Sequence, residues 1–297
     1  MTQKRAELLA PAGDMECLEF ALAYGADAVY LGAKEFGMRS SSANFGFEEM
    51  AAACGKAHGL GRRVYLTLNT LPTNEEIERL SATIEAGQAA GVDALIVADL
   101  GVLALAKRHA PKVEVHFSTQ AGITNYAAAT AAHDLGAKRG GLARELTLEQ
   151  IAGVRAKAPG GLELEVFVHG AMCMSVSGRC LLSQFLTGRD ANRGNCPQSC
   201  RWRYTLHEEQ RPGLAFEIGV GEGGSYILSA DDLSAAPILD KVLAAGADSL
   251  KTEGRSKSLY DAASVTAASP AAVNTALVRP PARIQSPHFP PEELPTT

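Results

Sequence analysis

The stretch ELLAPAGDMECLEFALAYGADAVYLG, residues 7–32, decides the fold, because it reads as strand, helix and strand in one short unit. ELLAP and DAVYLG are aliphatic runs typical of buried strands, and MECLEFALAYG between them predicts a helix. Gly25 stands where a left-handed residue would end that helix, directly before the next strand. A strand–helix–strand unit of this size indicates a parallel sheet.

The same alternation continues along the chain. Further aliphatic or β-branched runs occupy residues 62–69, 93–99, 113–120, 137–145 and 164–170, followed by 225–230 and 248–255. Alanine-rich helical stretches lie between many of them, and Gly91 and Gly136 stand at the expected ends of two helices. Eight or nine consecutive units favour a closed (β/α)8 barrel over an open doubly wound sheet, and no G-x-G-x-x-G motif follows the first strand.

These patterns predict one α/β domain, a TIM-like barrel over residues 6–262. A segment rich in cysteine and arginine, residues 171–224, follows the seventh strand and is predicted to be a metal-binding insertion. Residues 263–297 are rich in proline and lack helical periodicity, so we expect a disordered tail there.

The composition predicts a soluble protein with one large core. Of 297 residues, 46% are hydrophobic and 21% are charged, and the longest apolar run contains Asp93 and Asp99 and is too short to span a membrane. The N-terminus has no apolar signal-peptide region, so we expect a cytoplasmic protein whose thiols stay reduced. A net charge of −5 gives no general attraction for nucleic acids, so any RNA contact must come from a local basic patch.

Four cysteines within the insertion predict a metal site. Cys173, Cys180, Cys196 and Cys200 follow the spacing C-x6-C-x15-C-x3-C among glycines, serines and arginines. Structural zinc sites use closer cysteine pairs, whereas a [4Fe-4S] cluster needs only four converging sulfurs. The spacing therefore favours iron–sulfur, with zinc as the alternative. Cys17 and Cys54 occupy apolar positions of predicted helices and are expected to be structural.

Polar residues gather where the predicted strands end, which is where (β/α)8 barrels place their active sites. They are Tyr30, Asn69, Asp99, Ser118, Gln120, Arg144, Glu145, His169, Lys251, Glu253 and Arg255. A second group, Arg179, Arg189, Arg193, Arg201 and Arg203, surrounds the cysteines. This basic patch could offset the charge of a cluster, bind a small dicarboxylate or hold RNA phosphates; a solvated loop surface is the plain alternative.

Five segments of the chain are similar to motifs of a known family. They are ELLAPAGDMECLEFALAYGADAVYLG, VYLTLNTLPTNEE, FSTQAGITNYAAA, EVFVHGAMCMSVSGRCLLS and KTEGRSKSLY, which spread over about residues 6–262. Together they resemble the collagenase-like peptidases of unknown catalytic type, peptidase family U32. Within that family the chain is most similar to a branch whose members help make 5-hydroxyuridine at the wobble position of tRNA.

This resemblance implies a barrel that holds a [4Fe-4S] cluster on the four cysteines and carries out an oxygen-independent hydroxylation of uridine. It implies tRNA and prephenate as partners, no membrane, and an electron-donor protein as a further candidate partner. The candidate catalytic residues are His169, Glu165, Glu253 and Lys251. The candidate substrate-binding residues are Arg144, Arg179, Arg193, Arg201, Arg203, Arg255, Asn69 and Gln120.

Other functions stay open. Sister branches hydroxylate the ubiquinone ring or have been called collagenases, so a metal-dependent peptidase or hydrolase and a ubiquinone-ring hydroxylation factor are alternatives. An inactive, shortened RNA-binding homologue is another, because the resemblance ends near residue 262. The sixth strand is unusual as well, since Gly140 and Gly141 stand where apolar residues are expected and glycine weakens a strand.

Overall fold

The computed structural model describes residues 5–34, 44–171, 173, 175–176, 179–202, 204–207, 209, 215–218 and 232–254. Eight parallel strands form a barrel: β1 (Glu7–Pro11), β2 (Ala28–Gly32), β3 (Arg63–Leu68), β4 (Ala94–Val97), β5 (Glu114–Phe117), β6 (Arg139–Gly141), β7 (Glu163–Ala171) and β11 (Ser249–Thr252). Strands β1 to β6 pair in sequence, β6 pairs with β7, β7 with β11, and β11 with β1. The sheet is therefore closed, and the predicted (β/α)8 barrel is confirmed.

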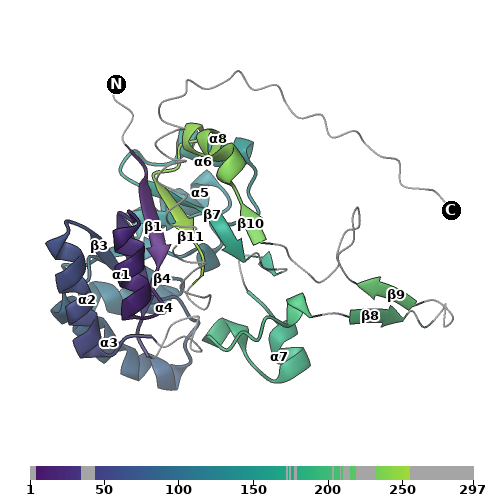
Figure 1. The fold of residues 1–297 in the computed structure, drawn as a ribbon, viewed down its shortest axis with the longest axis horizontal. Helices are drawn as coiled ribbons and strands as arrows, with labels where there is room; N and C mark the ends of the chain where they lie inside the picture. The colour runs from purple at the N-terminus through teal and green to yellow at the C-terminus, as the bar shows by residue number, and fades with distance from the viewer. Residues whose placement is uncertain are drawn as a thin grey trace.

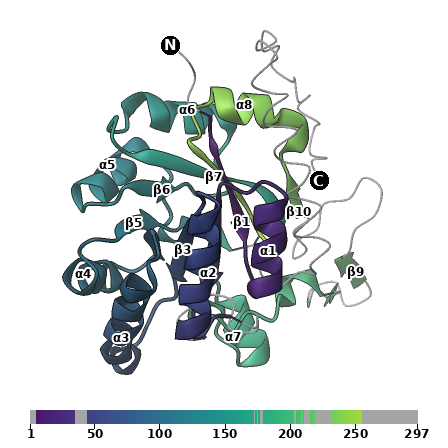
Figure 2. The same ribbon diagram turned by 60° about the vertical axis from the view of Figure 1, so that its left-hand side comes forward.

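Helices surround this barrel (Figures 1 and 2). They are α1 (Met15–Ala23), α2 (Phe47–Gly59), α3 (Asn74–Ala90), α4 (Leu100–His109), α5 (Tyr126–Asp134), α6 (Leu148–Lys157) and α8 (Leu239–Ala244). Gly25, Gly91 and Gly136 have φ angles of 96°, 88° and 89°, so they end their helices in the left-handed conformation that the sequence predicts. Within the described residues, no helix is long and apolar enough to cross a membrane.

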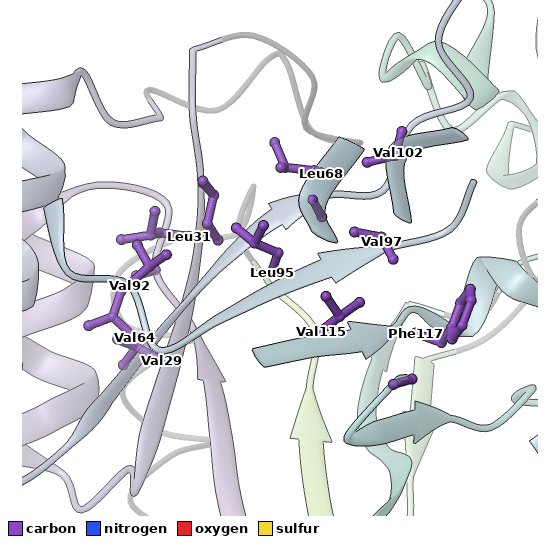
Figure 3. Close-up of a cluster of buried hydrophobic side chains, with 14 of the residues drawn as sticks. Val29, Leu31, Val64, Leu68, Val92, Leu95, Val97, Val102, Val115 and Phe117 are labelled. Atoms are coloured by element: carbon purple, nitrogen blue, oxygen red, sulfur yellow. The ribbon is translucent and has the colours of Figure 1, made fainter. Parts of the chain in front are cut away.

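The main core lies between the strands and the helices, as Figure 3 shows. Side chains alternate along each strand, so every second residue faces the helices and the others face the barrel interior. In β3, Val64 and Leu66 belong to the outer core, whereas Tyr65 packs inside the barrel with Leu9 and Tyr30. This alternation is what directs the residues at the strand ends into the barrel mouth.

The short strand β6 needs its second glycine. A Cβ on Gly141 would lie 2.8 Å from the carbonyl oxygen of Phe117 and 3.0 Å from the amide nitrogen of Thr119. The backbone of β6 can therefore approach the end of β5 only because Gly141 has no side chain. At Gly140 the contacts within 4 Å are side chains of the outer core.

The segment after β7 lies where the sequence predicts an insertion. It contains α7 (Leu182–Thr187), the 3₁₀ turns η3 (Ala191–Arg193) and η4 (Ser199–Arg201), and an antiparallel hairpin of β8 (Tyr204–His207) and β9 (Ala215–Ile218). In Figure 1, α7 lies on the side to which the arrow of β1 points, and the hairpin projects away from the barrel. The insertion is thus at the C-terminal end of the strands.

One strand departs from the parallel pattern. Strand β10 (Asp232–Ser234) pairs antiparallel with β7, with Leu233 opposite Gly170, and η5 (Ala236–Ile238) leads from it to α8. The strand predicted at residues 225–230 and the tail predicted at residues 263–297 lie outside the described residues.

Candidate active site

A cavity of about 110 Å³ lies at the C-terminal ends of the strands, which is several times the roughly 10–15 Å³ that a single water needs. Two sets of residues line it. The first comes from the strand ends and comprises Tyr30, Asn69, Ser118, Gln120, Arg144, Lys251 and Glu253. The second comes from the insertion and includes Cys173, Cys180, Cys196, Cys200 and Arg201. The polar strand ends and the cysteines, which are far apart in sequence, therefore share one cavity.

The four cysteines supply a donor set that suits an iron–sulfur cluster, because all four are free thiols at the wall of one cavity. Among the described residues, their present positions do not bring three metal-ligating side chains close enough to hold an ion. The amide nitrogen of Ser183 donates to Cys180 Sγ at 3.4 Å. The donor chemistry of the four thiols fits such a cluster.

The backbone of Cys180 is held in place by the side chain of Asn192. The side-chain oxygen of Asn192 accepts from the Cys180 amide at 3.1 Å, and its Nδ2 donates to the Cys180 carbonyl at 2.8 Å. Asn192 is itself placed on the barrel, because its carbonyl accepts from the amide of Leu71 at 3.1 Å. A second anchor joins Arg179 Nε to the carbonyl of Gln120 at 3.1 Å. These contacts hold the insertion over the ends of β3 and β5.

Lys251 forms part of the cavity wall although its side chain is only 6% exposed. Its ammonium lies 3.0 Å from Glu165 Oε1, 4.6 Å from the ring centre of Tyr30 and 5.4 Å from that of Phe167. Arg144 approaches the same Phe167 ring at 5.3 Å and donates to the carbonyl of Ala171 at 2.7 Å. Aromatic rings and a buried carboxylate therefore fix two cations at the cavity.

A layer of charge fills the barrel beneath the cavity. Arg139 Nη1 lies 2.6 Å from Glu7 and 3.4 Å from Glu165, and Nη2 lies 2.7 Å from Glu163. Burial by itself would raise the pKa of Glu165, but the charges of Lys251 and Arg139 outweigh burial and hold that pKa below its usual range. The layer thus keeps Glu165 ionised as the partner of Lys251.

An amide cluster lies on the β3 and β5 side of the cavity. Asn69 Nδ2 donates to Gln120 Oε1 at 3.0 Å and to Ser118 Oγ at 3.3 Å, and the Ser118 hydroxyl also donates to Gln120 Oε1. Asn69 and Ser118 are buried, and Gln120 is half-buried. The three side chains therefore hold one another in a fixed arrangement.

Several predicted residues lie elsewhere. Glu165 is buried below the cavity and reaches it only through Lys251, and His169 is on β7 but is not part of the cavity wall. Arg193 pairs with Glu76 at 2.6 Å on the outside of the insertion. Asp99 caps α4 by accepting from Gly101 and Val102. Arg203 and Arg255 lie outside the described residues.

The two cysteines outside the cluster are buried in helices, as the sequence predicts. Burial raises the pKa of the Cys17 thiol to about 11, and the nearby Asp14 makes a smaller contribution in the same direction. Burial likewise raises the pKa of the Cys54 thiol to about 12, with a smaller contribution from Asp93. Both thiols are therefore protonated at neutral pH and are poor metal ligands.

Sequence reasoning missed three residues that shape the site. Asn192 hydrogen-bonds to the backbone of Cys180, and the Phe167 ring contacts the cations of Arg144 and Lys251. His116 is fully buried inside the barrel. Burial lowers the pKa of His116, so its ring is neutral at pH 7. Strand alternation could have placed Phe167 and His116 inward, whereas nothing in the local sequence indicated the clamp by Asn192.

Comparisons with known proteins agree with this geometry. The family model of peptidase family U32 matches residues 13–289. The tRNA hydroxylation protein P1 of Bacillus subtilis is 41% identical over 262 residues, which cover 88% of this chain and 61% of that protein. The 23S rRNA 5-hydroxycytidine C2501 synthase of Escherichia coli is 37% identical over 267 residues, covering 90% of this chain and 39% of the synthase. The chain thus spans about three fifths of the length of the first of these relatives.

The fold agrees as well. The solved structure of a U32 peptidase matches with a TM-score of 0.55 at 14% identity, covering 83% of this chain and 92% of the other. The family match over most of the chain, together with the barrel and its cysteine-bearing insertion, shows that the chain belongs to peptidase family U32.

Proposed function

We propose that this chain is an iron–sulfur enzyme that modifies RNA, and that it hydroxylates the wobble uridine of tRNA to 5-hydroxyuridine in an oxygen-independent, prephenate-dependent reaction. One observation carries the proposal: four thiols and a set of fixed amides and cations line the same cavity. Relatives named for tRNA hydroxylation and for 5-hydroxycytidine synthesis support the choice of RNA as substrate.

Cys173, Cys180, Cys196 and Cys200 would hold the [4Fe-4S] cluster, which would supply electron transfer when bound. The chain's own contribution is the placement of the ligands. Asn192 fixes the backbone of Cys180 through two hydrogen bonds and ties it to the end of β3. That tie would keep the cluster at a constant distance from the strand-end residues.

The cations of the cavity would bind prephenate, whose two carboxylates need positive partners. Arg144, Arg201 and Lys251 line the cavity, and Glu253 is the acidic residue among the strand-end set. A guanidinium can hold a carboxylate with two parallel hydrogen bonds. Exposed arginines of the insertion, Arg179 and Arg189, would contact RNA phosphates outside the cavity.

The test is nucleoside analysis of tRNA from a bacterial strain that lacks its own uridine hydroxylation genes and is complemented by this chain. We expect 5-hydroxyuridine to return with the native chain and with Cys54→Ala, and to be absent with Cys196→Ala. Both substitutions remove one thiol, but Cys54 is buried in α2 away from the cavity.

Metal analysis separates the alternatives. Anaerobically purified protein should contain iron and acid-labile sulfide, and Cys196→Ala should lose both. One zinc per chain together with cleavage of a peptide substrate would refute the proposal in favour of a metal-dependent peptidase. An iron-loaded protein that restores no 5-hydroxyuridine would refute the proposed substrate.

A further inference from the structure

Asn69 carries a buried polar atom that has no hydrogen-bond partner among the described residues. The residue lines the cavity and is 8% exposed. Its Oδ1 is shielded from solvent and makes no hydrogen bond to any part of the chain that the structure describes. An unsatisfied acceptor of this kind is costly in a folded protein and is usually matched by a ligand or an ordered water.

The rest of the Asn69 amide is already used. Its Nδ2 donates to both Gln120 and Ser118, which uses both amide hydrogens. The Ser118 hydroxyl also donates to Gln120 Oε1, which occupies that oxygen and leaves the Gln120 amide nitrogen as the donor of that side chain. The cluster therefore contains one acceptor, on Asn69, and one amide donor, on Gln120, in two residues that line the cavity.

An amide acceptor and an amide donor together can complement a nucleobase edge. In uracil, the N3–H donor is flanked by two carbonyl acceptors, so Asn69 Oδ1 could accept from N3–H while Gln120 donates to an adjacent carbonyl. Paired amide contacts of this type are how proteins read bases, and enzymes that act on a base read its Watson–Crick edge.

We propose that Asn69, supported by Gln120, is the residue that recognises the target base, by accepting a hydrogen bond from N3–H of a uridine. The assignment rests on the proposed function, which makes a pyrimidine in RNA the substrate. Holding the N3 edge leaves the C5–C6 edge, on the opposite side of the ring, free to face the remainder of the cavity. Asn69 is therefore a specificity-determining residue, and the cysteines have no part in reading the base.

The position of Asn69 in the barrel agrees with this role. It follows β3, which lies four strands from β7 in the closed order and therefore directly across the barrel from the strand that leads to Cys173. A base held by its N3 edge at the end of β3 would point its other edge toward the barrel axis.

The test is a binding measurement on RNA hairpins that differ by one methyl group. One hairpin has a single uridine in its loop, and the other has 3-methyluridine there, which lacks the N3–H donor. Affinities are measured by fluorescence anisotropy at one fixed salt concentration, because phosphate contacts make RNA affinity depend on salt. The variants are Asn69→Ala and, as a control, Gln88→Ala. The side-chain oxygen of Gln88 also lacks a partner within the part of the chain that the structure describes, but Gln88 lies on α3 outside the cavity.

The native protein should bind the uridine loop at least about tenfold more tightly than the methylated loop, the ratio expected when a buried acceptor is left unpaired. Asn69→Ala should bring that ratio close to one, because it removes the acceptor and makes room for the methyl group. Gln88→Ala should keep the native ratio.

The assignment would be overturned by the native protein alone if it bound the two loops with equal affinity, or if it bound neither loop measurably. A ratio that survives in Asn69→Ala would overturn it as well. Turnover is scored separately on the uridine hairpin: a native ratio of tenfold without 5-hydroxyuridine refutes the hydroxylation and retains the base recognition.

Discussion

Replacing Arg139 by methionine should strongly destabilise the barrel. The Arg139 side chain is 2% exposed, and its guanidinium contacts the carboxylates of Glu7, Glu163 and Glu165 and the hydroxyl of Ser249. Methionine has a similar length but no charge, so the three carboxylates would lose their shared partner. Removing one member of a buried ion pair typically costs about 3–5 kcal/mol, because the other member stays buried without its counter-charge.

The contacts that the carboxylates keep in Arg139→Met explain why the loss in unfolding free energy should not exceed this range. Glu165 keeps Lys251 at 3.0 Å, and Glu7 keeps the hydroxyl of Tyr65 at 2.6 Å. The side chain of Glu163 is 19% exposed, so water can reach it in part. We therefore expect a loss of about 3–5 kcal/mol in the free energy of unfolding at pH 7, a large share of the 5–15 kcal/mol typical of a domain.

The loss should also depend on pH. In the native protein the pKa of Glu165 is depressed, so its contribution to stability is full above the unfolded value of about 4.5 and disappears as the pH falls through the folded value. In Arg139→Met, loss of the guanidinium raises the folded pKa of Glu165, so this carboxylate takes up a proton at higher pH. The difference in stability between the two proteins should therefore shrink as the pH is lowered from 7 toward 4.

The assay is urea denaturation followed by circular dichroism, because guanidinium chloride would screen the charges. Arg63→Met is the matched control: Arg63 lies 4.0 Å from Glu114, with side chains 52% and 41% exposed, and exposed pairs contribute about 0–1 kcal/mol. A loss below about 1 kcal/mol for Arg139→Met, or a loss that does not change with pH, would refute the account of the charge layer.

Two further predictions concern backbone contacts. Gly141→Ala should lower the unfolding free energy by about 1–3 kcal/mol, because the new Cβ would meet the Phe117 carbonyl at 2.8 Å. In the same urea titration, Gly140→Ala should lower the unfolding free energy by less, because its new Cβ would meet only side chains. Asn192→Ala should make Cys180 react faster with a thiol reagent and lower the iron content after reconstitution, since both hydrogen bonds to the Cys180 backbone are lost. An unchanged labelling rate would show that the clamp does not order the insertion.

Much of the barrel was predictable because its causes are local. Runs such as residues 28–32 and 94–97 alternate with helices that start at Asp14, Asp99 and Asn125, which accept from backbone amides of the first turn. The glycines that end the helices have positive φ as expected. Each of these signals depends on a few neighbouring residues, so it can be recognised without considering the rest of the chain.

The site was predictable only in part. A rule of the fold, that active sites lie at the C-terminal ends of strands, correctly brought Asn69, Gln120, Arg144 and Lys251 to one cavity. It could not separate residues that face the cavity from those beneath it. Glu165 precedes Phe167 by one inward position on β7, so its carboxylate reaches Lys251 and not the cavity.

The sequence by itself determined the repeating units, the four-cysteine insertion and its place after the seventh strand, because strand and helix periodicity and motif spacing are properties of neighbouring residues. Only the tertiary structure decided that Arg139 binds three carboxylates from β1 and β7 and that Asn192 ties Cys180 to the end of β3. It also decided that Asn69, a residue of the cavity wall, has a side-chain oxygen without a partner among the described residues. These contacts join residues from about 12 to 132 positions apart in the chain. Closure of the barrel brings the distant pairs together, and no local sequence pattern indicates which residues will come into contact.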